Sequence, residues 1–474
     1  MTLAQGSRPR PVVSFCHEPS YEHRILLPDG PAGARFASNK AKVLMRRRFA
    51  IHTGRIAVLN PLSDYGINQY VYELCEGLAE HGVTADVYTS AAPGLPAPRR
   101  HRRFSVMGSV LFKQRSEFEN PKCTPPSAAA PNWLEQALRM QGHGTSGSQL
   151  EERSHNWRKC FLTVEFLAHL RSQNYDWVWS QWPYISPYSQ SLFRGLTWLG
   201  LPLVHTVHNV LPHEEKPEDL EGCGQVYRAA DALIVHSKTA LAELSARFPD
   251  VSRKAHIVNH MSYTLFPRIP GARVRLRGQL GLGPNDPLAI MCGAVRPYKN
   301  VDGFIEALSD RRLSCVKGLI AGLEAGYPDV DSPDPLRHTR RLVSQFGICD
   351  RVRLIPRFLS IYEMAELFEA ADLVLLPYRH GSGSGQLMLA MTFGKVIVAT
   401  GVGGTDEYLS DYESGYLVSD PSAAAIVDGI KQALTTPVKP AVPHPKFHPV
   451  EVARTALTAL GIHSDTEGTA YVGD

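Results

Sequence analysis

The strongest constraint on the fold lies at residues 372–400, where two apolar segments flank a glycine-rich loop and a helix. The letters DLVLLP and VIVAT are short continuous apolar runs, which are typical of strands buried on both faces of a parallel sheet. Between them we predict a helix from near Ser384 to Gly394, because glycine commonly ends a helix. A strand, a helix and a second buried strand in succession indicate an α/β fold.

The loop in this stretch, YRHGSGSG at residues 378–385, follows directly after the first strand. Its glycines allow the backbone to approach a ligand closely, and its serines supply small hydroxyl groups. The N–H groups at the start of the next helix favour an anion, and Arg379 adds a cation. Open α/β sheets bind ligands at the ends of such strands. We therefore predict that this loop binds a phosphate or a similar anion.

The chain of 474 residues is long for one hydrophobic core, so we predict two domains. An alternation of strands and helices begins with RIAVLN at residues 55–60 and begins again with LAIMCGAV at residues 288–295. Each series is typical of a Rossmann-like domain. The predicted parts are a poorly ordered leader at 1–53, an N-terminal domain at 54–265 with an irregular insertion at 91–156, a linker at 266–283, a second domain at 284–436 and a tail at 437–474 with one last helix.

Composition narrows the partners and the compartment. Lys and Arg exceed Asp and Glu by only four residues, which argues against nucleic acid as a partner. The eight cysteines are scattered without a C-x-x-C pair, which favours free thiols in a reducing cytoplasm. The first turn after a strand holds Gly66 but no G-x-G-x-x-G pattern, which weakens a dehydrogenase interpretation. Gly66 either lets a ligand approach the helix start or serves as an ordinary turn glycine.

No apolar run reaches the roughly 20 residues that a membrane span requires, so any membrane contact is expected to be peripheral. Two basic segments are candidates for such contact, KAKVLMRRRFA at residues 40–50 and RRHRR at residues 99–103. Each is interpreted either as a solvated segment or as a contact for anionic lipid headgroups.

Polar groups are concentrated in LPLVHTVHNVLPHE, at residues 201–214, where an apolar strand runs into a loop. His205, His208, His213 and Glu214 all lie at the carboxyl end of this strand. Histidine and carboxylate side chains at such an edge are candidates for acid–base work. A single histidine at a strand end is more commonly a satisfied polar group of the core or loop, and that alternative stays open.

Two ordered segments of the second half carry a resemblance to a known family. They are CGAVRPYKNVDGFIEAL at residues 292–308 and the series from VRLIPRF to TDEYL at residues 352–409. Together they resemble the nucleotide-sugar-binding domain of GT-B glycosyltransferases, in particular the family 4-like, mostly retaining group. The resemblance covers residues 284–436 strongly and residues 55–262 more loosely. It implies an α/β GT-B fold with two Rossmann-like domains that face each other across a cleft.

The resemblance also implies roles for residues of the second half. Arg296 and Lys299 match a basic pair that holds the donor diphosphate, and fixed cations suit a leaving group that develops negative charge. Gly293 allows a tight turn beside them. Arg357 and Phe358 occupy the region that holds the nucleobase, although either could equally be a packing residue. The full set predicted to bind the donor is Gly66, Gly293, Arg296, Lys299, Arg357, Phe358, Arg379, Ser382, Gly383, Ser384, Gly385, Gln386 and Glu407.

The chain departs from the family pattern at one point. Typical members carry two glutamates before the A-M of the helix, and here Gly381 and Leu389 stand in those places. A subset of similar enzymes has a YR-x-x-x-x-SG loop instead, which YRHGSGSG resembles. Hydroxyl and backbone N–H groups of residues 382–386 would then face the phosphates or the sugar. Glu407 remains as a carboxylate, either for the donor or for the dipole of its own helix.

On the acceptor side, HTVHNVLPHE is similar to the loop that supplies a functional histidine in this group. We favour His208 as that residue, followed by His213, with Glu214 as the candidate carboxylate. No D-x-D motif occurs in the candidate loops, so the resemblance implies a reaction without a metal or another cofactor.

The predicted activity is therefore transfer of a hexosyl group, with retention, from a nucleoside diphosphate sugar to a glycan, lipid-linked or small-molecule acceptor. Two alternatives stay open. The first is another GT-B enzyme, such as a sugar-nucleotide epimerase or a phosphorylase. The second is a non-catalytic GT-B chain that acts as a nucleotide-sugar-binding or glycan-binding scaffold subunit, which the missing glutamate pair would explain.

Overall fold

The computed structural model describes residues 54–60, 65–90, 104–109, 155–181, 187–213, 215–325, 334–381, 383–436 and 442–462. The predicted leader, both basic segments, most of the predicted insertion, Glu214 and Ser382 lie outside the described residues. No helix in the described ranges is long and apolar enough to cross a membrane.

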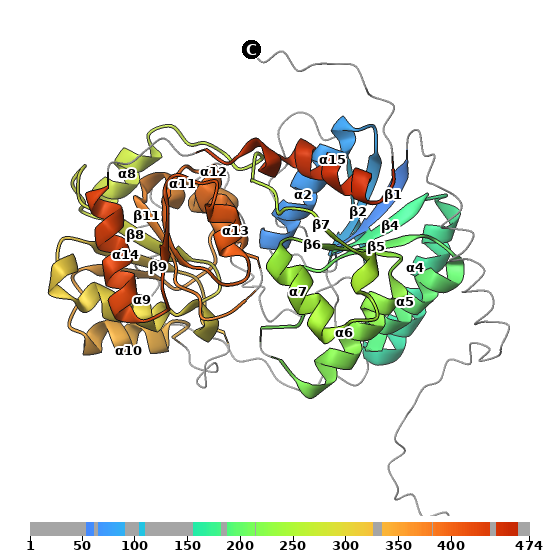
Figure 1. The fold of residues 1–474 in the computed structure, drawn as a ribbon, viewed down its shortest axis with the longest axis horizontal. Helices are drawn as coiled ribbons and strands as arrows, with labels where there is room; N and C mark the ends of the chain where they lie inside the picture. The colour runs from blue at the N-terminus through green and yellow to red at the C-terminus, as the bar shows by residue number, and fades with distance from the viewer. Residues whose placement is uncertain are drawn as a thin grey trace, which may run out of the picture. The chain divides into compact units, whose positions relative to one another are not determined.

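The described part of the first half forms a parallel sheet of seven strands in the order β3-β2-β1-β4-β5-β6-β7 (Figure 1). The strands are β1 (Arg55–Leu59), β2 (Thr84–Ser90), β3 (Ser105–Ser109), β4 (Trp177–Ser180), β5 (Leu203–Thr206), β6 (Ala232–Val235) and β7 (Ala255–Ile257). The helices are α2 (Tyr65–Glu80), α4 (His155–Ser172), α5 (Pro187–Leu199), α6 (Pro217–Ala229) and α7 (Lys238–Arg247). Strand β3 lies within the span predicted to be irregular, and it adds an edge to the sheet.

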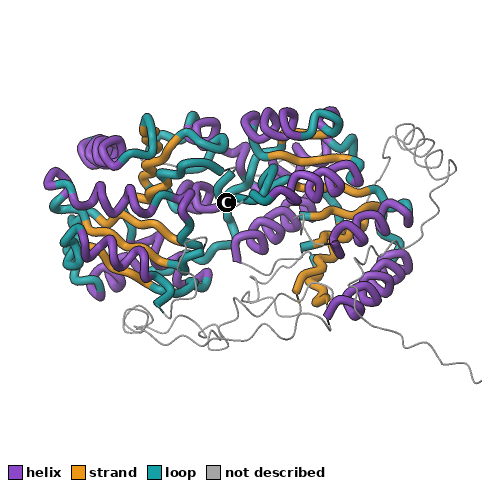
Figure 2. Tube along the Cα trace, turned by 90° about the horizontal axis from the view of Figure 1, so that it is seen from below, coloured by secondary structure: helices purple, strands orange, loops and turns teal. Residues whose placement is uncertain are grey.

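The described part of the second half forms a parallel sheet of six strands in the order β10-β9-β8-β11-β12-β13. The strands are β8 (Leu288–Cys292), β9 (Lys317–Ala321), β10 (Val352–Ile355), β11 (Leu373–Leu376), β12 (Val396–Thr400) and β13 (Gly415–Val418). The α-helices are α8 (Ala272–Gln279), α9 (Val301–Ser309), α10 (Arg337–Gln345), α11 (Ile361–Ala370), α12 (Gly385–Thr392), α13 (Thr405–Leu409) and α14 (Ala423–Thr435), and a short 3-10 helix, η4 (Pro297–Lys299), follows β8. Helices lie on both faces of the strands (Figure 2).

Strands β11 and β12 are buried along their whole length, as their sequences predict. They pair in parallel, with Leu373 beside Val396. Along β11, Leu373 and Leu375 pack into one apolar cluster, while Val374 and Leu376 pack into the cluster on the other face. Because successive side chains of a strand point to opposite faces, a continuous apolar run satisfies both clusters at once.

The chain passes from the first half to the second through residues 258–271. Its C-terminal helix packs on the first half again. Glu73 of α2 is buried and accepts hydrogen bonds of 2.6 Å from Thr264 Oγ1 and the backbone N–H of Leu265. The last helix, α15 (Pro449–Ala459), lies beside α2 (Figure 1). The His81 ring is 2.9 Å from the carbonyl of Val450 at this contact. The C-terminal helix therefore packs on the first half, although it follows the second half in sequence.

Candidate functional site

The glycine-rich loop leads into α12 as the sequence predicts. Ser384 precedes the helix, and its hydroxyl accepts a hydrogen bond of 3.3 Å from the N–H of Leu387. Gly381 and Gly383 have φ angles of +135° and +52°, which side chains rarely adopt. A Cβ at Gly385 would lie 2.8 Å from the hydroxyl of Tyr263, so the loop packs closely on the segment that joins the halves. The start of α12 is thereby held at the end of β11.

A second loop, after β8, brings a lysine to the start of α12. Gly293 has a φ angle of +92°, and a Cβ there would lie 3.3 Å from Lys299 Nζ and 3.5 Å from Gln386 Nε2. We call the arrangement of Gly293, Lys299 and Gln386 the Gly293 cradle. Three residues that the sequence predicts separately as donor-binding are therefore neighbours in space.

Lys299 is a cation without a carboxylate partner among the described residues. Burial lowers the pKa of its ammonium group to about 8; the nearby Cys292 opposes this shift, and the positive charge of Arg296 adds to it. An anion that entered the cradle would raise this pKa and relieve the cost of the desolvated charge. The cradle is therefore suited to a phosphate group.

Two arginines near these loops, Arg296 and Arg379, differ in their contacts. Arg296 is half-buried and directly precedes η4. Arg379 is exposed, and its guanidinium donates to Asn300 Oδ1 over 2.7 and 3.1 Å. The backbone N–H of Arg379 also donates to the carbonyl of Tyr298 over 2.8 Å. Arg379 thus ties the glycine-rich loop to η4, so the two donor-side loops support each other.

Arg357 has a structural role at the start of α11. Its guanidinium forms a two-pronged ion pair with Glu363, over 2.8 and 3.0 Å, and donates to the carbonyl of Phe358 over 3.0 Å. Glu363 in turn accepts from the N–H of Ser360 in a capping box. These contacts support the packing alternative for Arg357. Phe358 is half-buried beside it, and its contact with a nucleobase stays a prediction.

Glu407 caps a helix of the first half. Its carboxylate accepts hydrogen bonds of 2.9 Å from the N–H groups of Lys238 and Thr239 and from the Thr239 hydroxyl, all at the start of α7. Burial would raise the pKa of Glu407, but these hydrogen bonds and Lys238 outweigh it and lower the pKa. Both oxygens are engaged, so the structure gives Glu407 a capping role. Its negative charge therefore faces the positive end of the dipole of α7. The sequence predicts instead that Glu407 serves either the donor or the dipole of its own helix.

The histidines of the acceptor-side loop separate into different environments. His205 is fully buried in the core between Phe193 and Tyr227, and burial lowers its pKa to about 3. His208 is half-buried, and its Nε2 lies 3.3 Å from Gln181 Oε1. Burial and the neighbouring histidines hold the pKa of His208 well below its usual value. A neutral His208 can accept a proton, whereas His205 is a core residue.

His208 belongs to a group of rings that the sequence does not single out. The ring of Tyr70 on α2 lies 4.7 Å from His208, 5.3 Å from His236 and 5.0 Å from His260. We call these four residues the imidazole cluster. His236 and His260 each follow a strand, β6 and β7, which is the one local signal that could have indicated them. The hydroxyl of Tyr408 from the second half donates to the carbonyl of His236 over 2.5 Å and accepts from the N–H of His260 over 2.8 Å.

His213 reaches the donor-side loops. Its ring stacks on Tyr298 of η4, with 4.1 Å between ring centroids and 19° between planes. A Cβ at Gly381 would lie 3.5 Å from His213 Cε1. The loop after β5 therefore meets both loops that carry the predicted phosphate-binding groups. Gly66 lies in the first turn of α2, in the first half.

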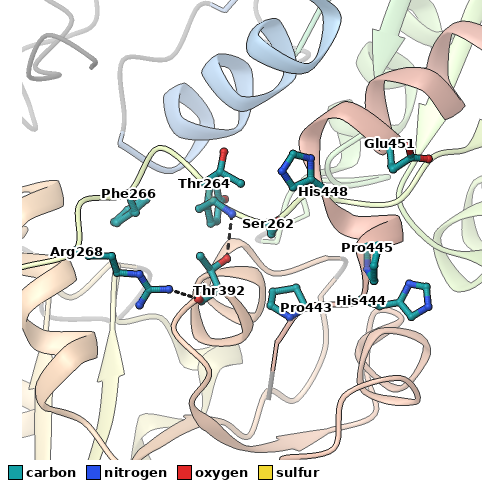
Figure 3. Close-up of a pocket in the computed structure, with 11 residues that line it drawn as sticks. Ser262, Thr264, Phe266, Arg268, Thr392, Pro443, His444, Pro445, His448 and Glu451 are labelled. Carbon is teal, nitrogen blue, oxygen red and sulfur yellow. Dashed lines mark hydrogen bonds between the residues drawn. The ribbon is translucent and has the colours of Figure 1, made fainter. Parts of the chain in front are cut away.

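A groove of about 540 Å³ lies beside the segment that joins the halves (Figure 3). None of the residues predicted to bind the donor lines it. Its lining comes from residues 262–268, from Thr392 and from residues 443–451. The one arginine in its lining, Arg268, is exposed, so among the described residues the groove differs from the Gly293 cradle, where Lys299 is half-buried. The described ranges also contain no group of three or more His, Cys, Asp or Glu residues that could hold a metal ion.

Comparison with protein families supports the same two halves. A family model described as glycosyltransferase family 4 matches residues 65–261, and one described as glycosyl transferases group 1 matches residues 273–444. The chain belongs to the family 4-like glycosyltransferases. This glycosyltransferase is 27% identical over 419 residues to a D-inositol 3-phosphate glycosyltransferase of Mycobacteroides abscessus, which covers 85% of each chain.

Solved structures show the fold of this glycosyltransferase to be GT-B, as predicted. Sucrose-phosphate synthase from Thermosynechococcus elongatus matches 86% of this chain and 94% of its own, at 18% identity and a TM-score of 0.55. The catalytic domain of starch synthase IV from Arabidopsis thaliana matches 85% of this chain and 95% of its own, at 13% identity and a TM-score of 0.59. HepE from Anabaena matches 86% of this chain and 94% of its own, at 14% identity and a TM-score of 0.55.

Proposed function

We propose that this glycosyltransferase takes its sugar from a nucleoside diphosphate sugar whose diphosphate binds at the Gly293 cradle. The observation that supports this most is the half-buried Lys299, which lacks a carboxylate partner among the described residues and lies beside the start of α12. Helix starts and buried cations both favour phosphate oxygens. HepE, which shares the fold, was solved with UDP and with UDP-glucose, which makes UDP the first nucleotide to test.

The chemistry at the cradle follows from where charge develops. As the bond between the anomeric carbon and the diphosphate breaks, the leaving oxygen gains negative charge. Lys299, Arg296 and the N–H groups at residues 384–386 would stabilise that charge without moving, which is the main source of such catalysis. We propose that these groups suffice and that the reaction requires no metal ion or other cofactor.

The acceptor is proposed to bind on the first half, near His208 and His213. A neutral His208 can accept a hydrogen bond from the attacking hydroxyl, and His213 already contacts Tyr298 of the donor side. Relatives named D-inositol 3-phosphate glycosyltransferase make inositol 3-phosphate one acceptor to test, beside glycans and lipid-linked sugars. We further propose a hexosyl donor, retention at the anomeric carbon, and a cytoplasmic location with peripheral membrane contact. The anomeric coupling in the product's NMR spectrum tests retention.

The decisive experiment removes the cation of Lys299. In Lys299→Ala we expect transfer to fall at least about 100-fold, since loss of one group that stabilises the developing charge typically has that effect. The affinities of Lys299→Ala for UDP, GDP and ADP, measured by calorimetry, should fall together with its transfer activity. Lys431→Ala is the matched control, because Lys431 is an exposed lysine of α14. Wild-type transfer by Lys299→Ala at a donor concentration below KM would disprove the proposed site.

A further inference from the structure

Gln386 in the Gly293 cradle is held by a cysteine. The side-chain oxygen Oε1 of Gln386 lies 2.9 Å from Sγ of Cys292, the buried last residue of β8. The cysteine and the glutamine come from elements 94 positions apart, which meet because β8 and β11 are neighbours in the sheet. The sequence singles out neither the thiol nor this contact.

The direction of this hydrogen bond decides which end of the amide faces the cradle. Burial raises the pKa of the Cys292 thiol to about 12, although Lys299 opposes the shift, so the thiol keeps its proton at neutral pH. A protonated thiol donates, and the amide oxygen is the group of Gln386 that can accept. The amide Nε2 is then left toward Gly293, 3.5 Å from the point that a Cβ would occupy.

A neutral donor suits this position better than a second cation. Burial and Arg296 already lower the pKa of Lys299, so another positive charge beside it would lower that pKa further. An amide N–H binds a phosphate oxygen without adding charge. A reversed amide would instead present its oxygen to the phosphate, and two acceptors would face each other.

We propose that Gln386 is a donor-binding residue whose side-chain amide donates to the diphosphate, and that Cys292 is the positioning residue that orients it. This inference rests on the proposed function, since it needs a diphosphate in the cradle. It adds a side-chain contact to the backbone groups of α12 and assigns a role to a cysteine outside the predicted site.

The test compares single and double variants by their affinity for whichever of UDP, GDP and ADP the wild-type enzyme binds. Gln386→Met keeps the length of the side chain and removes the amide, so we expect affinity to fall about tenfold. Cys292→Ala leaves the amide free to turn, with an expected loss of about threefold or more, whereas Cys292→Ser, which keeps a donor, should restore most of it. In Cys292→Ala/Gln386→Met the loss should equal that of Gln386→Met alone, because the thiol acts only through the amide.

A matched control separates positioning from packing. Cys223 is another buried cysteine, in α6 of the first half, and Cys223→Ala should lower thermal stability without changing nucleotide affinity. Additive losses in the double variant, or unchanged affinity in Gln386→Met, would overturn this inference and leave the proposed function standing. A wild-type enzyme that binds none of the three nucleotides would overturn both.

Discussion

The Gly293 cradle and the imidazole cluster both place titratable groups after the carboxyl ends of parallel strands, but their surroundings differ. In the cradle, Lys299 lies beside a glycine and has no carboxylate partner among the described residues. In the cluster, rings at 4.7–5.3 Å from Tyr70 pack against one another. A lowered pKa occurs in both, so it does not identify a binding site alone. What distinguishes the cradle is a charge without a carboxylate partner in the described part of the chain, beside a position that has no side chain.

The largest expected effect comes from filling the cradle. Gly293→Ala places a methyl group 3.3 Å from Lys299 Nζ and 3.5 Å from Gln386 Nε2, and it strains a backbone with φ of +92°. We expect nucleotide affinity to fall about 100-fold, because the ligand and two binding groups lose their geometry. Calorimetric titration of the variant and the wild type with UDP measures this loss of affinity.

Gly347→Ala is the control for backbone strain. Gly347 has a φ of +67°, and a Cβ there meets no atom within 4 Å, so this variant carries strain without filling a site. Both variants should lose stability, and only Gly293→Ala should lose affinity. Equal affinities in the two variants would remove the distinction between the cradle and an ordinary turn.

Local signals made part of this site predictable. The burial of β11 and β12 follows from their apolar runs, and the start of α12 follows from Ser384 and the glycines before it. The contact between Cys292 and Gln386 depends on the order of strands in the sheet, which no local pattern specifies. The cap that Glu407 provides joins residues 169 positions apart, so the sequence, which assigns Glu407 to the donor or to its own helix, could not indicate this contact.

Within the imidazole cluster, His236 and His260 should affect stability more than binding. Burial lowers the pKa of His236 to about 4 and that of His260 to about 3, against about 6.5 in the unfolded chain. Since the unfolded state then binds more protons, the stability that these residues contribute is complete above pH 6.5 and is lost as the pH falls toward 4. Each histidine should lower the free energy of unfolding by up to about 1.4 kcal/mol per pH unit in that window.

His236→Asn tests this slope. The amide can still donate to the carbonyl of Val258, which His236 Nδ1 contacts at 2.9 Å, but it cannot titrate. Urea unfolding between pH 7.5 and 4.5 should show a shallower decline than in wild type, and His380→Asn, at an exposed position, should follow wild type. Glu73 acts in the opposite sense, since burial raises its pKa to about 8 and its contribution is lost as the pH rises from about 4.5 to 8. An unchanged slope in His236→Asn would contradict burial as the cause.

The smallest expected effect is at Glu407, where the sequence and the structure give different roles. Glu407→Gln keeps the shape of the side chain but removes the charge that faces the start of α7, so stability should fall by about 0.5–1 kcal/mol. Nucleotide affinity should stay at the wild-type value, because both carboxylate oxygens already accept hydrogen bonds from Lys238 and Thr239. Thermal unfolding and UDP titration of the same variant separate the two roles. A tenfold loss of affinity at unchanged stability would return Glu407 to the donor site and show that a carboxylate engaged in a helix cap can still serve the ligand.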